Sequence, residues 1–132
     1  MKKLILCVLV CVTIVLSGAL ILAQSQENID GYMNRDGTLV QYTTWRTTTT
    51  TGQVRLNLNN NTANVTRLGL RNRAGVQFTN TEQWDSLGWR NFHLSSTGSS
   101  TIPQGTRFAF NGRMNSVTWP WADNYWAGTL TF

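Results

Sequence analysis

The feature that most constrains the fold of this chain is a series of short runs, after residue 24, in which apolar and polar residues alternate. A period of two places the apolar residues on one face of a strand, and no window has the 3.6-residue period of an amphipathic helix. The apolar members of the clearest runs are Val54, Leu56 and Leu58; Leu68 and Leu70; Phe108 and Phe110; and Trp126, Leu130 and Phe132. Residues that favour turns separate the runs, as at 59–61 and 103–105. About eight short strands spaced in this way predict an all-β protein, a small antiparallel β-sandwich or barrel.

The N-terminus has the layout of a secretory signal peptide. Lys2 and Lys3 precede an apolar run over residues 4–16, and small residues suited to cleavage follow it. We therefore expect residues 1–23 to be removed and the protein to be secreted. The alternative is an uncleaved anchor, because the apolar stretch approaches the roughly 20 residues that span a bilayer.

The rest of the chain has the length of one domain. We expect residues 24–132 to form a single β domain, in which residues 24–33 are a loosely attached lead-in. Both cysteines, Cys7 and Cys11, lie in the signal segment, so the mature protein is expected to have no disulfide and no cysteine-based metal site. We expect no cofactor.

The charge of the mature chain is mildly basic. Lys2 and Lys3 are the only lysines, so nine arginines remain against six acids, a formal charge of +3. Nucleic-acid binders normally show a stronger and more concentrated basic face, so nucleic acid is not the expected partner. Arginine binds carboxylates and phosphates in two-point contacts and stacks on aromatic rings.

Residues 118–126 contain three tryptophans and one tyrosine, interrupted by Pro120. Proline donates no backbone hydrogen bond, so this segment is predicted to be a loop or a sheet edge, and its rings cannot all be core. Flat rings beside polar side chains suit the faces of sugars. We expect the ligand surface to be formed by Trp121, Asp123, Asn124 and Tyr125, with Trp84 lining the same region.

Two other tryptophans are expected in the core. Trp126 is in register with Leu130 and Phe132, and Trp89 lies in another predicted strand. Trp121 is expected to be the most exposed ring.

Catalysis is not predicted. The only histidine, His93, lies beside apolar residues on a probable strand and is expected at the surface. Glu82, Asp85 and Asp123 could in principle serve glycoside hydrolysis, but acids in polar loops are usually only solvated. Nothing in the sequence pairs a named acid with a named base.

The sequence therefore predicts a secreted, non-enzymatic β protein that binds a polysaccharide or cell-surface glycan through exposed Trp and Tyr with Asp, Asn and Arg. The main alternative is a small cytolytic or antimicrobial protein that acts on membrane lipid headgroups, because Trp and Tyr also suit the membrane interface. A small glycoside hydrolase is a weaker alternative.

Overall fold

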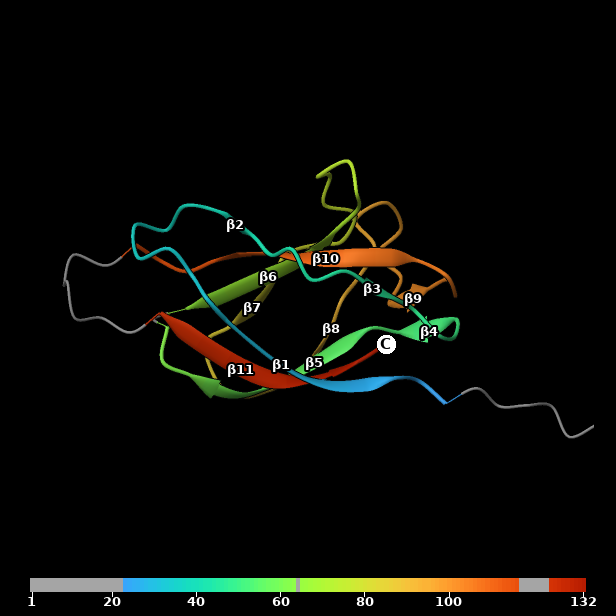
Figure 1. Ribbon diagram of the computed structural model, residues 1–132, viewed down its shortest axis with the longest axis horizontal. Helices are drawn as coiled ribbons and strands as arrows, with labels where there is room; N and C mark the ends of the chain where they lie inside the picture. Colours follow the sequence, from blue (N-terminus) through green and yellow to red (C-terminus); the bar gives the residue numbers. More distant parts are fainter. Residues whose placement is uncertain (1–22, 64, 117–123) are drawn as a thin grey trace, which may run out of the picture.

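The computed structural model describes residues 23–63, 65–116 and 124–132, and these form two β-sheets packed face to face (Figure 1). Sheet A has the strand order β1 (Gln26–Tyr32), β11 (Tyr125–Thr131), β5 (Arg55–Asn61) and β8 (Gly88–Asn91). Sheet B has the order β2 (Val40–Gln41), β10 (Arg107–Arg113), β6 (Thr66–Arg71) and β7 (Glu82–Trp84), and β3 (Arg46–Thr47) also pairs with β10. A small ribbon of β4 (Gly52–Gln53) and β9 (Thr101–Ile102) lies at one end.

The predicted all-β antiparallel architecture is confirmed. Every strand pair in the described part of the chain is antiparallel, and no helix occurs there. The residues that the structure describes form eleven strands rather than about eight, because four of them are only two residues long. No helix long and apolar enough to span a membrane is found in the described ranges. Residues 1–22 lie outside those ranges, so the signal peptide stays a prediction.

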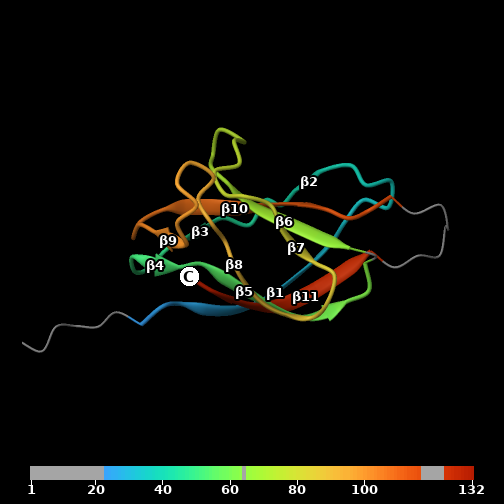
Figure 2. The same cartoon turned by 180° about the vertical axis from the view of Figure 1, so that it is seen from behind.

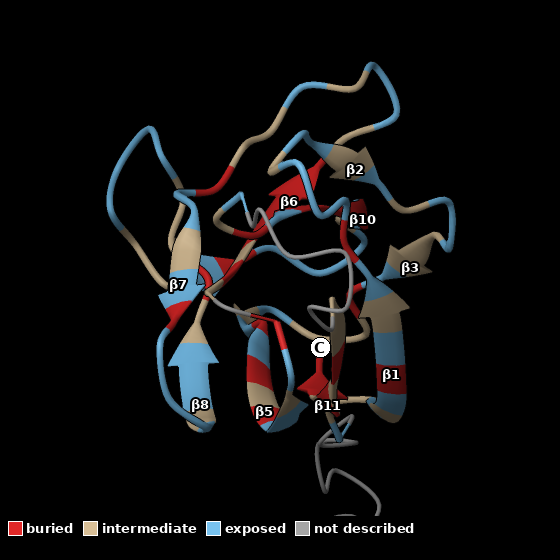
Figure 3. Ribbon diagram, turned by 90° about the vertical axis from the view of Figure 1, so that its left-hand side faces the viewer, coloured by how far each residue is buried: buried red, intermediate tan, exposed pale blue. Residues whose placement is uncertain are grey.

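The alternating runs supply the core between the two sheets. All ten of the apolar residues that define those runs are buried, from Val54 in the β4–β5 connection to Phe132 after β11. The rings of Phe108, Phe110, Phe132 and Trp126 form a chain of edge contacts with centroids 5.7–6.1 Å apart, an arrangement that aromatic pairs favour. Figure 3 shows buried positions alternating with a less buried one along β5 in the sheet A layer.

The prediction of a loosely attached segment over residues 24–33 is wrong. Residues 26–32 form β1, and each of them is paired with a residue of β11. Before this strand, Ser25 exchanges two backbone hydrogen bonds with Phe132, at 2.7 and 2.9 Å. The segment carries few apolar residues, so its pattern is weak, but the backbone ladder and the buried side chains of Ile29 and Met33 attach it to the sandwich.

Tyr42 joins the two layers. Its ring lies beside Gly31 of β1 and Gly112 of β10, where an added Cβ would approach the ring to 2.6 and 2.8 Å. The Tyr42 hydroxyl donates a hydrogen bond to the Tyr32 carbonyl at 2.9 Å and accepts one from Trp126 Nε1 at 2.8 Å. Burial raises the pKa of Tyr42 to about 12. The two glycines are therefore needed for the close approach of a ring that satisfies a buried indole.

A second link between the layers is ionic. The buried guanidinium of Arg46 in β3 makes a two-point contact with Glu27 of β1, at 2.6 and 3.0 Å. The same guanidinium lies 5.9 Å from the centre of the Phe110 ring. Figure 2 shows the same two layers from behind, with β10 and β6 above β5 and β11.

Candidate functional site

The side of sheet A that faces away from sheet B carries an unbroken row of side chains across all four strands. Asn28 of β1 is paired with Thr129 of β11, Thr129 with Asn57 of β5, and Asn57 with Trp89 of β8. Directly opposed residues of antiparallel strands project from the same face. None of the four side chains is buried. We call this surface the open face of sheet A.

A β-bulge shapes the middle of the open face. The pairing of β11 with β5 shifts between Ala127 and Gly128, so that Asn59 of β5 has no partner in the ladder. A bulge of this kind redirects the side chain of the extra residue. Gly128 is required here, because a Cβ at this position would lie 2.3 Å from the carbonyl oxygen of Asn57.

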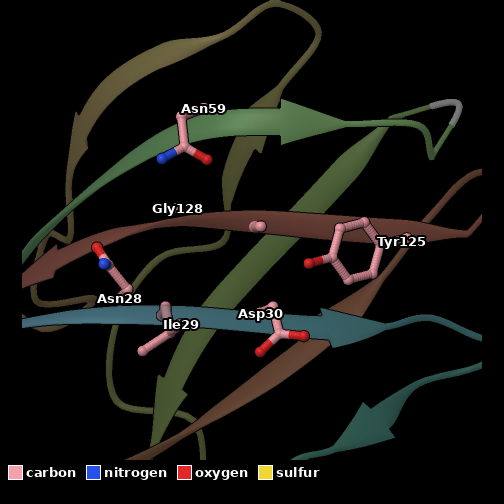
Figure 4. A pocket seen from close by; sticks show the side chains of 7 residues that line it. Asn28, Ile29, Asp30, Asn59, Tyr125 and Gly128 are labelled. Atoms are coloured by element: carbon pink, nitrogen blue, oxygen red, sulfur yellow. The ribbon is translucent and has the colours of Figure 1, made fainter.

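The bulge lies at an open depression of about 270 Å³. Its lining comes from β1, β5 and β11: Asn28, Ile29, Asp30, Asn59, Tyr125, Ala127 and Gly128. Figure 4 shows the side chains of Asn28, Asp30, Asn59 and Tyr125 arranged around Gly128. The depression thus offers two amides, one carboxylate and one phenol around a floor of bare backbone.

Tyr125, one of the predicted ligand residues, lies at one end of this depression. Its ring is 5.1 Å from that of Tyr32, its partner on β1, with the planes tilted by 54°. The pKa of Tyr125 is raised above its ordinary value, mainly by loss of hydration and to a smaller extent by the negative charge of Asp30. The phenol therefore stays protonated at neutral pH and can donate a hydrogen bond, while Asp30 can accept one.

Trp89 lies at the other end of the row, and the prediction that it belongs to the core is wrong. Its residue surface is 49% exposed. The guanidinium of Arg55 lies 4.7 Å from the centre of its ring. Because β8 is an edge strand of sheet A and Trp89 is opposite Asn57, the ring falls on the open face. The Arg55 guanidinium therefore orients the Trp89 ring but leaves it accessible to solvent.

Trp84, in contrast, cannot be the ligand residue that the sequence suggested. Its surface is 0% exposed, and its ring packs against Phe92 between the sheets, with centroids 6.0 Å apart. Its Nε1 donates a hydrogen bond to the Gly88 carbonyl at 3.0 Å, which closes the turn between β7 and β8. Trp84 is therefore a core residue that fixes where β8 and Trp89 lie.

The other predicted ligand residues divide into two groups. Trp121 and Asp123 lie outside the described residues, so their roles stay predictions. Asn124 extends the ladder between β1 and β11: its carbonyl accepts a hydrogen bond from Met33 N at 2.9 Å, and its side-chain amide donates to the Met33 carbonyl. The amide of Asn124 is thus already occupied by the fold.

The acids considered for catalysis have partners of other kinds. Glu82 contacts His93 Nδ1 at 2.9 Å, and Asp85 lies 3.5 Å from Arg90. His93 is partly exposed, as expected from the sequence. Within the described ranges no group of three or more histidine, cysteine, aspartate or glutamate residues could hold a metal ion.

No family model, curated protein sequence or solved structure matches this chain. The site must therefore be interpreted from its own chemistry. The open face of sheet A combines exposed rings, side-chain amides and a single carboxylate on a nearly continuous strand surface. Such a surface can stack on apolar faces of a ligand and make hydrogen bonds to its hydroxyl groups.

Proposed function

We propose that this protein is a secreted, non-enzymatic binding protein that recognises a neutral glycan through the open face of sheet A. The observation that carries the proposal is the polar depression at the bulge, which lies beside Tyr125 and in the same face as Trp89. The predicted signal peptide over residues 1–23 would place this surface outside the cell.

The chemistry of the face favours a sugar over other ligands. Sugars present apolar ring faces and several hydroxyl groups, which aromatic rings and amides can contact at once. Three asparagines and a threonine lie on the same face as the rings, and each amide can both donate and accept. Asp30 is the one carboxylate of the depression, and it disfavours a polyanionic ligand there.

The spacing of the rings indicates a ligand with several sugar units. Tyr125 is four residues from Thr129 along β11, which is about 13 Å of strand. The row from Thr129 to Trp89 crosses two strand spacings, about 10 Å. A glycan that contacts both Tyr125 and Trp89 would therefore run diagonally across the sheet over about 16 Å.

Affinity electrophoresis of the mature protein against a panel of neutral soluble polysaccharides tests the proposal. Tyr125→Ala is expected to weaken retention about tenfold to a hundredfold, as loss of an anchor ring does. Tyr125→Phe keeps the ring and should lose less. Gln104→Ala, an exposed residue in the turn before β10, is the control and should bind like the wild type.

Three outcomes would contradict the proposal. If Tyr125→Ala and Trp89→Ala are retained as well as the wild type by every polysaccharide that binds, the open face is not the site. If Trp121→Ala alone abolishes retention, the site is the segment around residue 121, as the sequence predicted. Release of reducing sugars during the assay would show that the protein is a hydrolase.

A further inference from the structure

The outer face of sheet B, on the opposite side of the sandwich, is strongly basic. The outward-facing positions of β6 and β10 hold four arginines: Arg67, Arg71, Arg107 and Arg113. None of the five acids in the described ranges lies among them. Glu27 and Asp30 are in sheet A, Asp85 contacts Arg90, and Glu82 contacts His93. Asp36 is turned toward Thr38, to which its carboxylate is hydrogen-bonded at 2.7 and 2.9 Å.

Two of these arginines are directly opposed. Arg113 of β10 is the register partner of Arg67 of β6, and neither forms an ion pair within the described residues. Like charges directly opposite each other destabilise a sheet. The Nε of Arg67 donates a hydrogen bond to Gln83 at 3.0 Å, which orients the group without neutralising it. The sheet therefore keeps an unfavourable pair of like charges. An anion bound between the two guanidiniums would relieve their repulsion.

The other two arginines share one ring. The guanidiniums of Arg71 and Arg107 lie 4.8 and 5.7 Å from the centre of the Trp45 ring. Arg71 is only 7% exposed, and its Nε has no hydrogen-bond partner. Its other contacts among the described residues include a 2.7 Å hydrogen bond to the Tyr42 carbonyl but no carboxylate. A buried cation without a counter-charge raises the positive potential over this whole face.

Exposed aliphatic side chains lie at the margin of the same face. Leu39 is 51% exposed and immediately precedes β2, whose Val40 is paired with Gly112, the neighbour of Arg113. Val76 is 59% exposed and lies, with the exposed Arg73, in the hairpin between the bridged residues Arg71 and Gln77. In Figures 1 and 2 this hairpin rises from the sheet B layer on the side away from sheet A.

We propose that the outer face of sheet B docks the protein on an anionic lipid surface. Arg67, Arg73, Arg107 and Arg113 meet the headgroup phosphates, and Leu39 and Val76 enter the boundary between headgroups and acyl chains. Arginine forms two-point contacts with phosphate, and basic residues beside aliphatic ones are the usual composition of a peripheral membrane-binding surface. The inference is independent of glycan binding, which uses the opposite face.

A lipid surface fits this face better than an anionic polysaccharide. A sugar chain would need open rings, but Trp45, the one aromatic side chain that the described residues place among these arginines, already has two guanidiniums against its ring. A sugar chain would also leave Leu39 and Val76 without a function. Docking requires only adsorption, so no membrane-spanning element is implied.

The test is co-sedimentation of the full mature protein with phosphatidylcholine vesicles that contain or lack phosphatidylglycerol. We expect binding only when phosphatidylglycerol is present, and weakening as salt rises. Arg67→Gln/Arg113→Gln should lower the partition coefficient about thirtyfold, since each basic residue near an anionic surface contributes about fivefold. Leu39→Ser/Val76→Ser, in a protein that keeps all its arginines, should also lower the partition coefficient.

Arg55→Gln/Arg90→Gln is the matched control, because it removes the same charge from sheet A. It should partition onto the vesicles like the wild type, and thermal unfolding should show that all three double variants are folded. The inference is overturned if Arg67→Gln/Arg113→Gln and Arg55→Gln/Arg90→Gln lose binding equally, if vesicles without phosphatidylglycerol bind as well, or if only a sulfated polysaccharide and no vesicle retains the protein.

Discussion

Trp84 and Trp89 lie five residues apart on either side of one turn, and truncating each should have opposite consequences. A fully buried tryptophan ring removes about 150–250 Å² from water. At about 25 cal/mol per Å², and with the cavity left between the sheets, Trp84→Ala should cost about 3–5 kcal/mol of unfolding free energy. Trp84→Ala also leaves the Gly88 carbonyl without its donor.

Trp89→Ala removes a ring that is half exposed, so about half of that area and one contact with Arg55 are lost. The expected cost is about 2–3 kcal/mol of unfolding free energy. Glycan affinity, by contrast, should fall about tenfold or more if Trp89 contacts the ligand.

Equilibrium urea unfolding of the two variants, followed by tyrosine fluorescence and far-ultraviolet circular dichroism, measures the difference. If the unfolding free energies of the two variants depend on urea concentration with equal slopes, they can be compared directly. The reasoning is refuted if Trp89→Ala unfolds more easily than Trp84→Ala, because the two rings would then have the opposite locations.

Three further predictions concern stability. The free energy of unfolding should fall between about pH 10 and pH 12, because Tyr42 titrates near 10 when unfolded and near 12 when buried. The expected loss is about 2–3 kcal/mol. Urea titrations across this pH range should show a smaller loss in Tyr42→Phe. Gly112→Ala should cost about 1–3 kcal/mol, seen as a lower urea midpoint, because its Cβ would lie 2.8 Å from the Tyr42 ring. Arg113→Gln should leave the melting temperature unchanged or raise it, since it removes the repulsion from Arg67; a clear fall would mean that the pair is structurally required.

The sequence predicted the core well because alternation determines which residues share a face. Leu56 and Leu58, or Trp126 and Leu130, were grouped correctly and lie between the sheets. Alternation cannot say which face points inward when a strand is short and lies at an edge. This is why Trp89 was placed in the core.

Other features depend on contacts between distant segments. β1 offers one buried apolar side chain, Ile29, in its seven residues, so its place in the sheet comes mainly from backbone pairing with β11. The bulge that leaves Asn59 unpaired is visible only once β5 and β11 are aligned. Tyr125 was predicted as a ligand residue from its aromatic neighbourhood, but its neighbours Asp30 and Asn59 could not be, because they lie far from it in the sequence.

The central claim is that a glycan binds on the open face of sheet A. The most direct measurement is the set of amide and side-chain chemical shifts in the nuclear magnetic resonance spectrum of the labelled mature protein, recorded as a binding oligosaccharide is added. The shifts are expected to change along one path across the sheet: Asn28, Asp30, Tyr32, Asn57, Asn59, Trp89, Tyr125 and Thr129. Changes confined to sheet B or to residues 117–123, with the signals of the open face unmoved at saturation, would contradict the account.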